Sequence, residues 1–306
     1  MIKDVPTEAD FHRSAARFLE AAWSDALAEI DGEIYEEEMR LETGEEPEVE
    51  NSRIFSKEST LAISYIALYT GVEHILRASI TAVSPFLLLA GDPMKWPSKC
   101  DSKDVPFADF RTIDAQDLIR VYDTVCASRV SETFKDKYNN LRRERNSLIH
   151  SHSLSVKIVA KDLVETIFFA TDALVGPRAW LDWRRNMLKA REDKYNSWNF
   201  LLTRELNLAL HVMGEAAARK YLGINKRRRR YFCPACLSGC TRTEDQMAAY
   251  EYIEGLAQLN VKDPNLLNCI VCEGESRVER EKCPDPKCKG NVIGGDWCMT
   301  CGRIAP

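Results

Sequence analysis

The sequence predicts a mainly α-helical protein that carries a small C-terminal zinc-binding module with short β-hairpins. Apolar residues recur at helical spacing through most of the first 222 residues. Eight of the eleven cysteines then form four closely spaced pairs after residue 232, a spacing typical of tetrahedral metal sites. We therefore predict a helical domain at 1–222, a basic linker at 223–232 and a zinc-binding module at 233–306.

Charge is unevenly distributed along the chain. The formal net charge is -5, but residues 29–50 hold eleven acidic side chains against Arg40 alone. The rest of the chain is therefore net positive, so that the overall charge does not exclude a nucleic-acid partner.

The sequence favours a cytoplasmic protein that is not inserted in a membrane. Its first ten residues are charged where a secretory signal needs apolar residues. The most apolar region, 61–90, is interrupted by Glu73, His74 and Arg77, and its uninterrupted run is too short to span a bilayer. In a reducing compartment, closely paired cysteines favour zinc thiolates over disulfides.

Five helices are expected before residue 175. The first begins after Thr7 and extends to about Met39, and the acidic segment GEEPEVENS behind it is a solvated loop. The others start near Ser56, cover about 114–127 after a loop at 91–111, begin at Ser131 with Glu132, and span 159–174. A long helical pattern then covers 178–222, in which we interpret four side chains as packing residues: Trp180, Trp183, Met187 and Tyr195.

The helix that begins at Ser131 carries an arginine on its apolar stripe. Arg145 falls in a gap of that stripe, where a leucine would pack, so that its charge needs a carboxylate, a phosphate or a partner subunit. The stripe consists of Phe134, Tyr138, Leu141 and Leu148.

The same helix contains the pattern Arg145-Asn146-x-x-x-His150. Asn146 and His150 are four residues apart, so we expect their side chains to meet. Arg145 lies about 140° around the helix from His150, and one helix alone would not converge both on one atom. A two-fold dimer would bring two arginines and two histidines into one cleft.

Residues 145–150 resemble the Arg-polar-x3-His signature of the HEPN superfamily, and YTGVEHILRAS at 69–79 is similar to its acidic-centred helix. The resemblance is strongest at 56–175. It implies a helical bundle with long flanking helices, a homodimer and a metal-independent ribonuclease, with Glu73 as a further site residue. His152 stands where HEPN toxins controlled by nucleotidyl modification carry tyrosine, and that control is not expected here.

Metal-independent RNA cleavage needs a base, an acid and a cation for the phosphorane charge. His150 suits the first two roles and Arg145 the third. Two histidines in a dimer would divide the acid and base work and leave 2′,3′-cyclic phosphate and 5′-hydroxyl ends. The alternative is a structural one, in which Arg145 pairs with Glu73 or Glu144 and His150 merely ends a helix.

Two groups of cations are candidates for RNA binding. One lies beside the motif and the other is a run of five cations, for which a solvated linker is the alternative. The candidates are Arg142, Arg143, Lys226, Arg227, Arg228, Arg229 and Arg230.

The cysteine pairs supply ligands for two structural Zn²⁺ ions, and no cofactor is expected for catalysis. The pairs are Cys233/Cys236, Cys269/Cys272, Cys283/Cys288 and Cys298/Cys301. Residues 269–290 are similar to the zinc-ribbon hairpins of DnaJ-type chaperones. That similarity favours a site shared by the two inner pairs, although pairing in consecutive order stays open.

Three further cysteines lie outside these pairs. Cys240 is close enough in sequence to replace Cys236, whereas Cys100 and Cys126 are expected to be structural. The module itself is expected to contact RNA or a protein.

Two functions are therefore carried forward. The first is an endoribonuclease of toxin or phage-defence type that acts on RNA as a homodimer. The second is a non-catalytic zinc-ribbon adaptor or nucleic-acid-binding regulator, dimerised by its helical domain.

Overall fold

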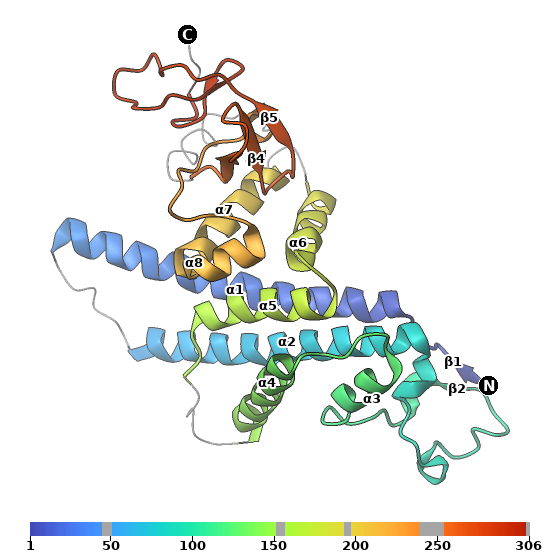
Figure 1. Cartoon of the computed structure of the whole chain (residues 1–306). Helices are drawn as coiled ribbons and strands as arrows, with labels where there is room; N and C mark the ends of the chain where they lie inside the picture. Colours follow the sequence, from blue (N-terminus) through green and yellow to red (C-terminus); the bar gives the residue numbers. More distant parts are fainter. Residues whose placement is uncertain (45–50, 151–156, 193–196, 239–253, 304–306) are drawn as a thin grey trace. The chain divides into compact units, whose positions relative to one another are not determined.

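The computed structural model describes residues 1–44, 51–150, 157–192, 197–238 and 254–303, with side chains of the helix at 51–83 described from residue 57 onward. The chain is mainly helical, as predicted, with most of its short strands in the C-terminal part (Figure 1). It divides into two compact units, Met1–Ala179 and Trp180–Pro306. Residues 223–232, which we predicted to be a linker, lie inside the second unit.

Two long helices, α1 (Glu8–Thr43) and α2 (Asn51–Val83), pack side by side in the first unit (Figure 1). The N-cap is Thr7, whose hydroxyl accepts from the backbone of Asp10 at 3.2 Å while the Asp10 carboxylate accepts from the backbone of Thr7 at 3.0 Å. Such a capping box satisfies two otherwise unpaired amides. The predicted start at Thr7 is confirmed, and the helix ends at Gly44 with a left-handed φ of 70°.

Gly71 allows α1 and α2 to approach closely. A Cβ at this position would lie 2.7 Å from the side chain of Leu19, nearer than atoms can pack. Any larger residue would push the two helices apart.

Helix α2 lies at the centre of the first unit, because α1, α3, α4 and α5 all pack against it. The predicted helices at 114–127, from 131 and at 159–174 are confirmed with bounds shifted by a few residues, and Ser131 accepts from the backbone of Phe134 at 3.2 Å. The observed helices are α3 (Leu118–Val125), α4 (Glu132–His150) and α5 (Ala160–Leu174).

The segment predicted as a loop at 91–111 contains short ordered pieces. The 3₁₀ turns within it are η2 (Pro93–Lys95) and η3 (Phe107–Asp109), and a further 3₁₀ turn, η1 (Pro85–Leu88), lies just before it. Strand β2 (Val105–Pro106) pairs in parallel with β1 (Ile2–Lys3). Two-residue strands give no periodic signal, and the sequence therefore did not predict them.

The second unit begins with separate helices where we predicted one long helical pattern at 178–222, so that prediction was wrong. The helical segments are α6 (Ala179–Ala190), α7 (Trp198–Val212), α8 (Glu215–Ala217) and the π-helical turn η4 (Ala218–Leu222). Extended backbone at Met213 and Gly214 separates α7 from α8. Trp180 is buried as predicted, while Tyr195 lies outside the described residues.

Short β-hairpins follow in the second unit, as predicted for the cysteine-rich module. Antiparallel pairing joins β3 (Ala257–Leu259), β4 (Leu266–Cys269) and β5 (Glu275–Arg277). A second hairpin joins β6 (Ile293–Gly294) to β7 (Trp297–Cys298), and the short helix α9 spans Pro234–Ser238. Among the described helices, none combines the length and apolarity that crossing a bilayer requires.

Candidate metal centres and the Arg145–His150 site

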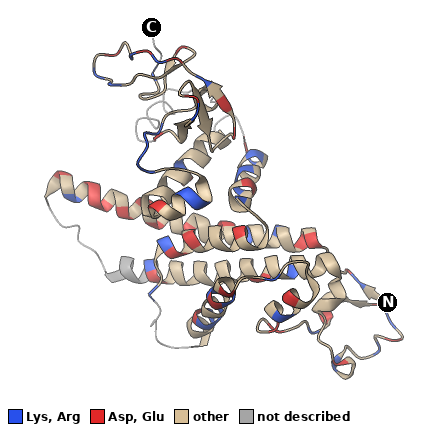
Figure 2. Cartoon of the chain, in the orientation of Figure 1, with Lys and Arg blue, Asp and Glu red and all other residues tan. Residues whose placement is uncertain are grey.

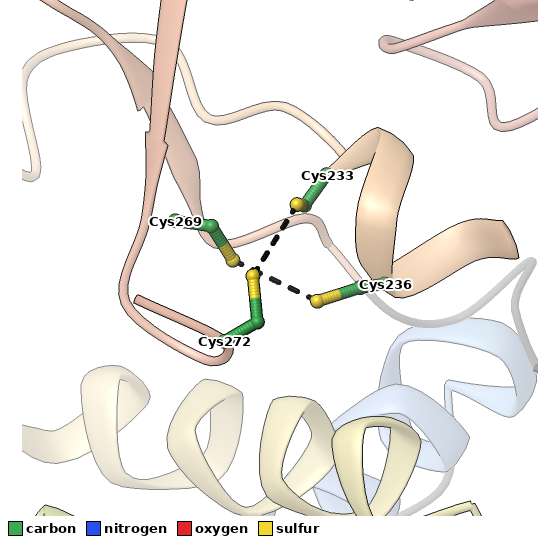
Figure 3. Close-up of side chains that lie close together, drawn as sticks. All are labelled: Cys233, Cys236, Cys269 and Cys272. Atoms are coloured by element: carbon green, nitrogen blue, oxygen red, sulfur yellow. Dashed lines mark hydrogen bonds between the residues drawn. The ribbon is translucent and has the colours of Figure 1, made fainter. Parts of the chain in front are cut away.

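Four cysteines from two segments of the second unit converge on one point. The sulfur atoms of Cys233, Cys236, Cys269 and Cys272 all lie within 4.8 Å of one another and point inward (Figure 3). Cys233 and Cys272 are 3.7 Å apart, and Cys236 and Cys269 are 3.8 Å apart. Four thiols at this spacing match the ligand set of a closed tetrahedral metal site.

A second group of four cysteines repeats this arrangement. Cys283 lies 3.9 Å from Cys301, and Cys288 lies 3.9 Å from Cys298. All four sulfur atoms again lie within 4.8 Å of one another. The chain thus has two four-cysteine groups positioned to bind metal ions, and it uses all eight predicted ligands.

The cysteine pairs combine in consecutive order, and the arrangement favoured by the DnaJ-type similarity was wrong. The reason is strand pairing: Ala257 bridges Tyr231 on one side and faces Cys269 on the other, which brings the segment before Cys233 beside Cys269. In the second group, Ile293 bridges Glu279 and faces Cys298. In each cysteine group, one strand thus pairs with both of the segments that carry the cysteines, and it brings them together.

Buried polar side chains hold both halves of the first cysteine group. Arg185, on α6, donates to the carbonyl of Val271 at 2.9 Å and to that of Ile270 at 3.2 Å, the two residues between Cys269 and Cys272. Asn199, on α7, donates to the carbonyl of Cys236 at 2.9 Å. Sequence reasoning missed both supports, because Arg185 and Asn199 lie in helices that carry other polar residues as well.

The cysteine thiols of the first group shift one another's pKa because they lie so close together. Hydrogen bonds with Cys236 and then Cys269 lower the pKa of Cys233 to about 7. The same contacts, led by that with Cys233, raise the pKa of Cys236. A bound cation would replace these protons, since thiolates are the form that binds metal.

The remaining cysteines do not join these groups in the described part of the chain. Cys126 is half-buried and lies 3.7 Å from the carbonyl of Ser79, and burial raises the pKa of its thiol. Cys100 is half-buried in the first unit. Cys240 lies outside the described residues.

In the first unit, aromatic packing fixes α4 on α2. Tyr138 stacks on Tyr69 with ring centroids 5.8 Å apart, and Phe134 stacks on Phe169 of α5 at 6.0 Å. Phe134, Tyr138 and Leu141 are all buried, as the predicted stripe requires, and Leu148 is half-buried. The motif therefore lies on the last two turns of a helix whose first half is anchored in the core.

Arg145 is half-buried above an aromatic ring. Its guanidinium carbon lies 5.2 Å from the ring centroid of Tyr69, and one of its terminal nitrogens donates to Asn146 Oδ1 at 2.9 Å. Its Nε is buried and has no hydrogen-bond partner. Within the described part of the chain it forms no ion pair, so the expected alternative partners Glu73 and Glu144 do not neutralise it.

Both of those carboxylates bind other groups. Glu73 accepts two bonds from Arg77, at 3.0 and 2.6 Å, within α2. Glu144 accepts from the hydroxyl of Tyr65. The predicted site residue Glu73 thus lies one helical turn beyond Tyr69, where it orients Arg77.

Three tyrosine hydroxyls surround this end of the site. The Tyr69 and Tyr138 hydroxyls lie 3.3 Å apart, and Tyr138 donates to the carbonyl of Ala115 at 3.0 Å. Burial raises the pKa of Tyr65, Tyr69 and Tyr138. These hydroxyls therefore stay protonated at neutral pH, and they present no negative charge to Arg145. Tyr65 and Tyr69 are four residues apart on α2, and Tyr138 comes from α4.

His150 is the last residue of α4 and is exposed. The expected meeting of Asn146 with His150 is not seen as a hydrogen bond among the described residues, and the Asn146 side-chain oxygen accepts from Arg145. His152 lies outside the described residues. Arg145 and His150 share helix α4, and no hydrogen bond joins their side chains among the described residues.

Helix α4 is densely charged, and its ribbon is coloured blue and red at many positions (Figure 2). Arg143 is exposed and donates to Asn140 on the same helix. Arg142 is half-buried, with an Nε that has no hydrogen-bond partner. Both lie within one turn of Arg145 on α4.

The basic segment 226–230 is folded against the second unit. Lys226 donates to the carbonyls of Leu210 and Met213 at the end of α7, at 2.7 and 2.9 Å. Arg228 donates to the carbonyl of Leu259, and Arg230 pairs with Glu254. Arg227 pairs with Glu215 at 2.9 Å, and Arg229 lies over the ring of Tyr231. The segment is therefore more than a solvated linker.

No protein-family model matches the chain, and no curated protein or solved structure is significantly similar to it. The site must be interpreted from its own residues.

Proposed function

We propose that the chain is a metal-independent endoribonuclease of toxin or phage-defence type, with a composite site formed by Arg145 and His150 from two copies of α4. The observation that supports it is Arg145 itself. A half-buried guanidinium that is held by an aromatic ring and an amide retains its positive charge for an anion. Carboxylate and phosphate both match such a planar donor, and phosphate is the anion that RNA presents.

In this proposal the protein supplies every group that RNA cleavage needs. His150 of one copy takes the proton of the ribose 2′-hydroxyl, whose oxygen attacks the adjacent phosphorus. His150 of the other copy gives a proton to the departing 5′-oxygen. The products are a 2′,3′-cyclic phosphate and a 5′-hydroxyl. Arg145 stabilises the negative charge of the phosphorane, and Asn146 holds the guanidinium in place.

Two copies are required in this proposal because Arg145 and His150, five residues apart, are separated by about 140° around an ideal helix. A homodimer with facing α4 helices places each arginine beside the partner's histidine. Exposed Ile149, next to His150, is an apolar side chain that such an interface would cover.

The two cysteine groups would hold structural Zn²⁺. Each offers four thiols and leaves no position open for water, and zinc there would stabilise the fold of the second unit. The proposed reaction uses His150 and Arg145 alone.

The test is cleavage of total RNA by the purified chain and by His150→Ala in the presence of a fast chelator. We expect wild-type protein to leave cyclic-phosphate ends and His150→Ala to be about 10²–10⁴-fold slower. Equal cleavage by both proteins, or none by either, contradicts the proposal.

The alternative function is a zinc-ribbon adaptor or nucleic-acid-binding regulator without catalysis. It is favoured by the closed thiol sets, which are typical of binding modules, and by the basic segment folded beside them. RNA binding without any cleavage in the assay above would select it.

A further inference from the structure

A large surface pocket of about 1010 Å³ lies within the second unit, between the basic segment and the second cysteine group. The basic segment contributes Lys226, Arg228, Arg229 and Arg230 to its lining. The second cysteine group contributes Lys287, Lys289 and Arg303. These seven cations face two carboxylates, in a chain whose net charge is -5. We call this the basic pocket.

The cations of the basic pocket fall into two kinds. Lys226, Arg228 and Arg230 are fixed by bonds to backbone carbonyls or to Glu254, and they form an ordered positive wall. Lys287 and Lys289 are exposed and form no ion pair with any described residue. Their charges are available to a ligand.

The fold of the second cysteine group determines where Lys287 and Lys289 lie. Lys287 and Lys289 flank Cys288, and Arg303 follows Cys301 by two residues. Arg303 is oriented by Asp285, whose carboxylate lies 3.3 Å from its guanidinium. The cations on this wall are thus placed by the fold of a metal-binding group and not by a helix.

The shape and charge favour an extended polyanion. The volume is at the upper end of the range of ligand pockets, more than a single phosphate would fill. Charged lysines and arginines spread over two walls match phosphates spaced along a backbone. The apolar lining residues Phe232 and Met299 are 8% and 0% exposed, so that no aromatic face is offered to a base.

We propose that the basic pocket binds the phosphodiester backbone of RNA, independently of base sequence. Lys287 and Lys289 of the second cysteine group act together with the segment 226–230. This inference deepens the RNA-binding part of the proposed function, because it identifies which surface holds the substrate and how it is recognised. It predicts that the cysteine-rich module holds RNA while the cleaving residues lie in the other unit.

The experiment measures binding of a fluorescent 20-nucleotide oligouridine over a range of salt concentrations. All proteins carry His150→Ala, so that binding is separated from cleavage. The test variant is Lys287→Gln/Lys289→Gln, and the matched control is Lys262→Gln/Arg277→Gln, two exposed cations of the same unit outside the pocket. Metal content is measured on each variant to show that the cysteine groups are intact.

We expect the test variant to bind about tenfold more weakly near 0.1 M salt, with a salt slope smaller by about 1.4, or about 0.7 for each lost phosphate contact. The control should match the parent. Oligouridine and a mixed-sequence RNA should bind alike, and a DNA strand of equal length shows whether the sugar matters. An unchanged salt slope in the test variant overturns the inference, and so does equal competition by polyglutamate, which would assign the pocket to an acidic protein.

The two proposals fail separately. If RNA binds through the pocket but the wild-type chain never cleaves it, the ribonuclease proposal fails and the basic pocket stands. If the wild-type chain cleaves RNA and the Lys287→Gln/Lys289→Gln variant binds it unchanged, the basic-pocket proposal fails and the ribonuclease proposal stands.

Discussion

Arg145 lies over the ring of Tyr69 with its guanidinium carbon 5.2 Å from the ring centroid, and this contact takes the place of an ion pair. A cation–π contact holds the side chain without neutralising it. The arginine is thereby both fixed and still charged, which is the state that phosphate binding requires.

Replacing Arg145 tests that role directly. Arg145→Lys keeps the charge but loses the planar pair of donors, so we expect RNA cleavage to fall about 10²–10³-fold while the fold is retained. Cleavage rate and circular dichroism are measured together. Arg120→Lys, an exposed substitution in the same unit, is the control and should cleave normally. Full activity of Arg145→Lys would remove the guanidinium from the mechanism.

A mixing experiment tests the composite site. Arg145→Ala lacks both arginines and His150→Ala lacks both histidines, but a mixed dimer pairs the arginine of one copy with the one remaining histidine of the other, which can serve as base or as acid. We expect two inactive proteins to regain part of the wild-type rate when they are combined, and native mass spectrometry to show the dimer. A heterodimer no faster than His150→Ala alone, which has no histidine at all, would contradict a site shared between two copies.

Arg185 provides a test of how the first metal site is supported. Its side chain is 7% exposed and binds the two carbonyls between Cys269 and Cys272. We expect Arg185→Met to weaken metal binding by the first cysteine group about 10–100-fold, because those carbonyls lose the donor that orients the ligands. Competition with a chromophoric chelator measures this for each group. The second group of the variant, and both groups of Arg219→Met, should keep the wild-type affinity, and loss from both groups would point to general unfolding.

His74 predicts how stability depends on pH in the first unit. Burial lowers the pKa of His74 from its usual 6.5, and its Nδ1 lies 2.9 Å from the Ser14 hydroxyl. The unfolded chain then binds the proton more tightly than the folded chain does. Neutral His74 therefore makes its full contribution to the free energy of unfolding above pH 6.5. That contribution is lost as the pH falls from 6.5 toward the lower pKa of His74 in the folded chain.

Urea unfolding at several pH values between about 5 and 7.5 measures this effect. We expect the wild-type midpoint to fall on acidification, and His74→Gln to show a flatter profile over the same range. His12, which is on α1 and half-buried, offers the comparison His12→Gln. An equally steep profile in His74→Gln would assign the pH dependence to other groups.

Features with a strong local signal were predictable from the sequence. Thr7 and Asp10 mark the start of α1 because a capping box is a local pattern, and the stripe from Phe134 to Leu141 marks the buried face of α4. The eight metal ligands were likewise evident from their spacing.

Features that depend on contacts distant in sequence were not predictable. The pairing of the cysteines follows from the position of Ala257 between Tyr231 and Cys269, which no local pattern encodes. The partners of Arg145 depend on how α4 sits on α2. In the sequence Lys287 and Lys289 look like ordinary surface residues. Only the fold shows that they line the same pocket as the basic segment.

The consecutive arrangement of the cysteines has a consequence for the order in which the two metal sites form. In the second group Cys288 and Cys298 are 10 positions apart, whereas in the first Cys236 and Cys269 are 33 apart. Closing the longer loop costs about 1 kcal/mol more in chain entropy. The second cysteine group, which closes the shorter loop, is therefore expected to form first when metal is supplied to the unfolded chain. The first group also requires α6 and α7 to be folded, because these helices carry Arg185 and Asn199.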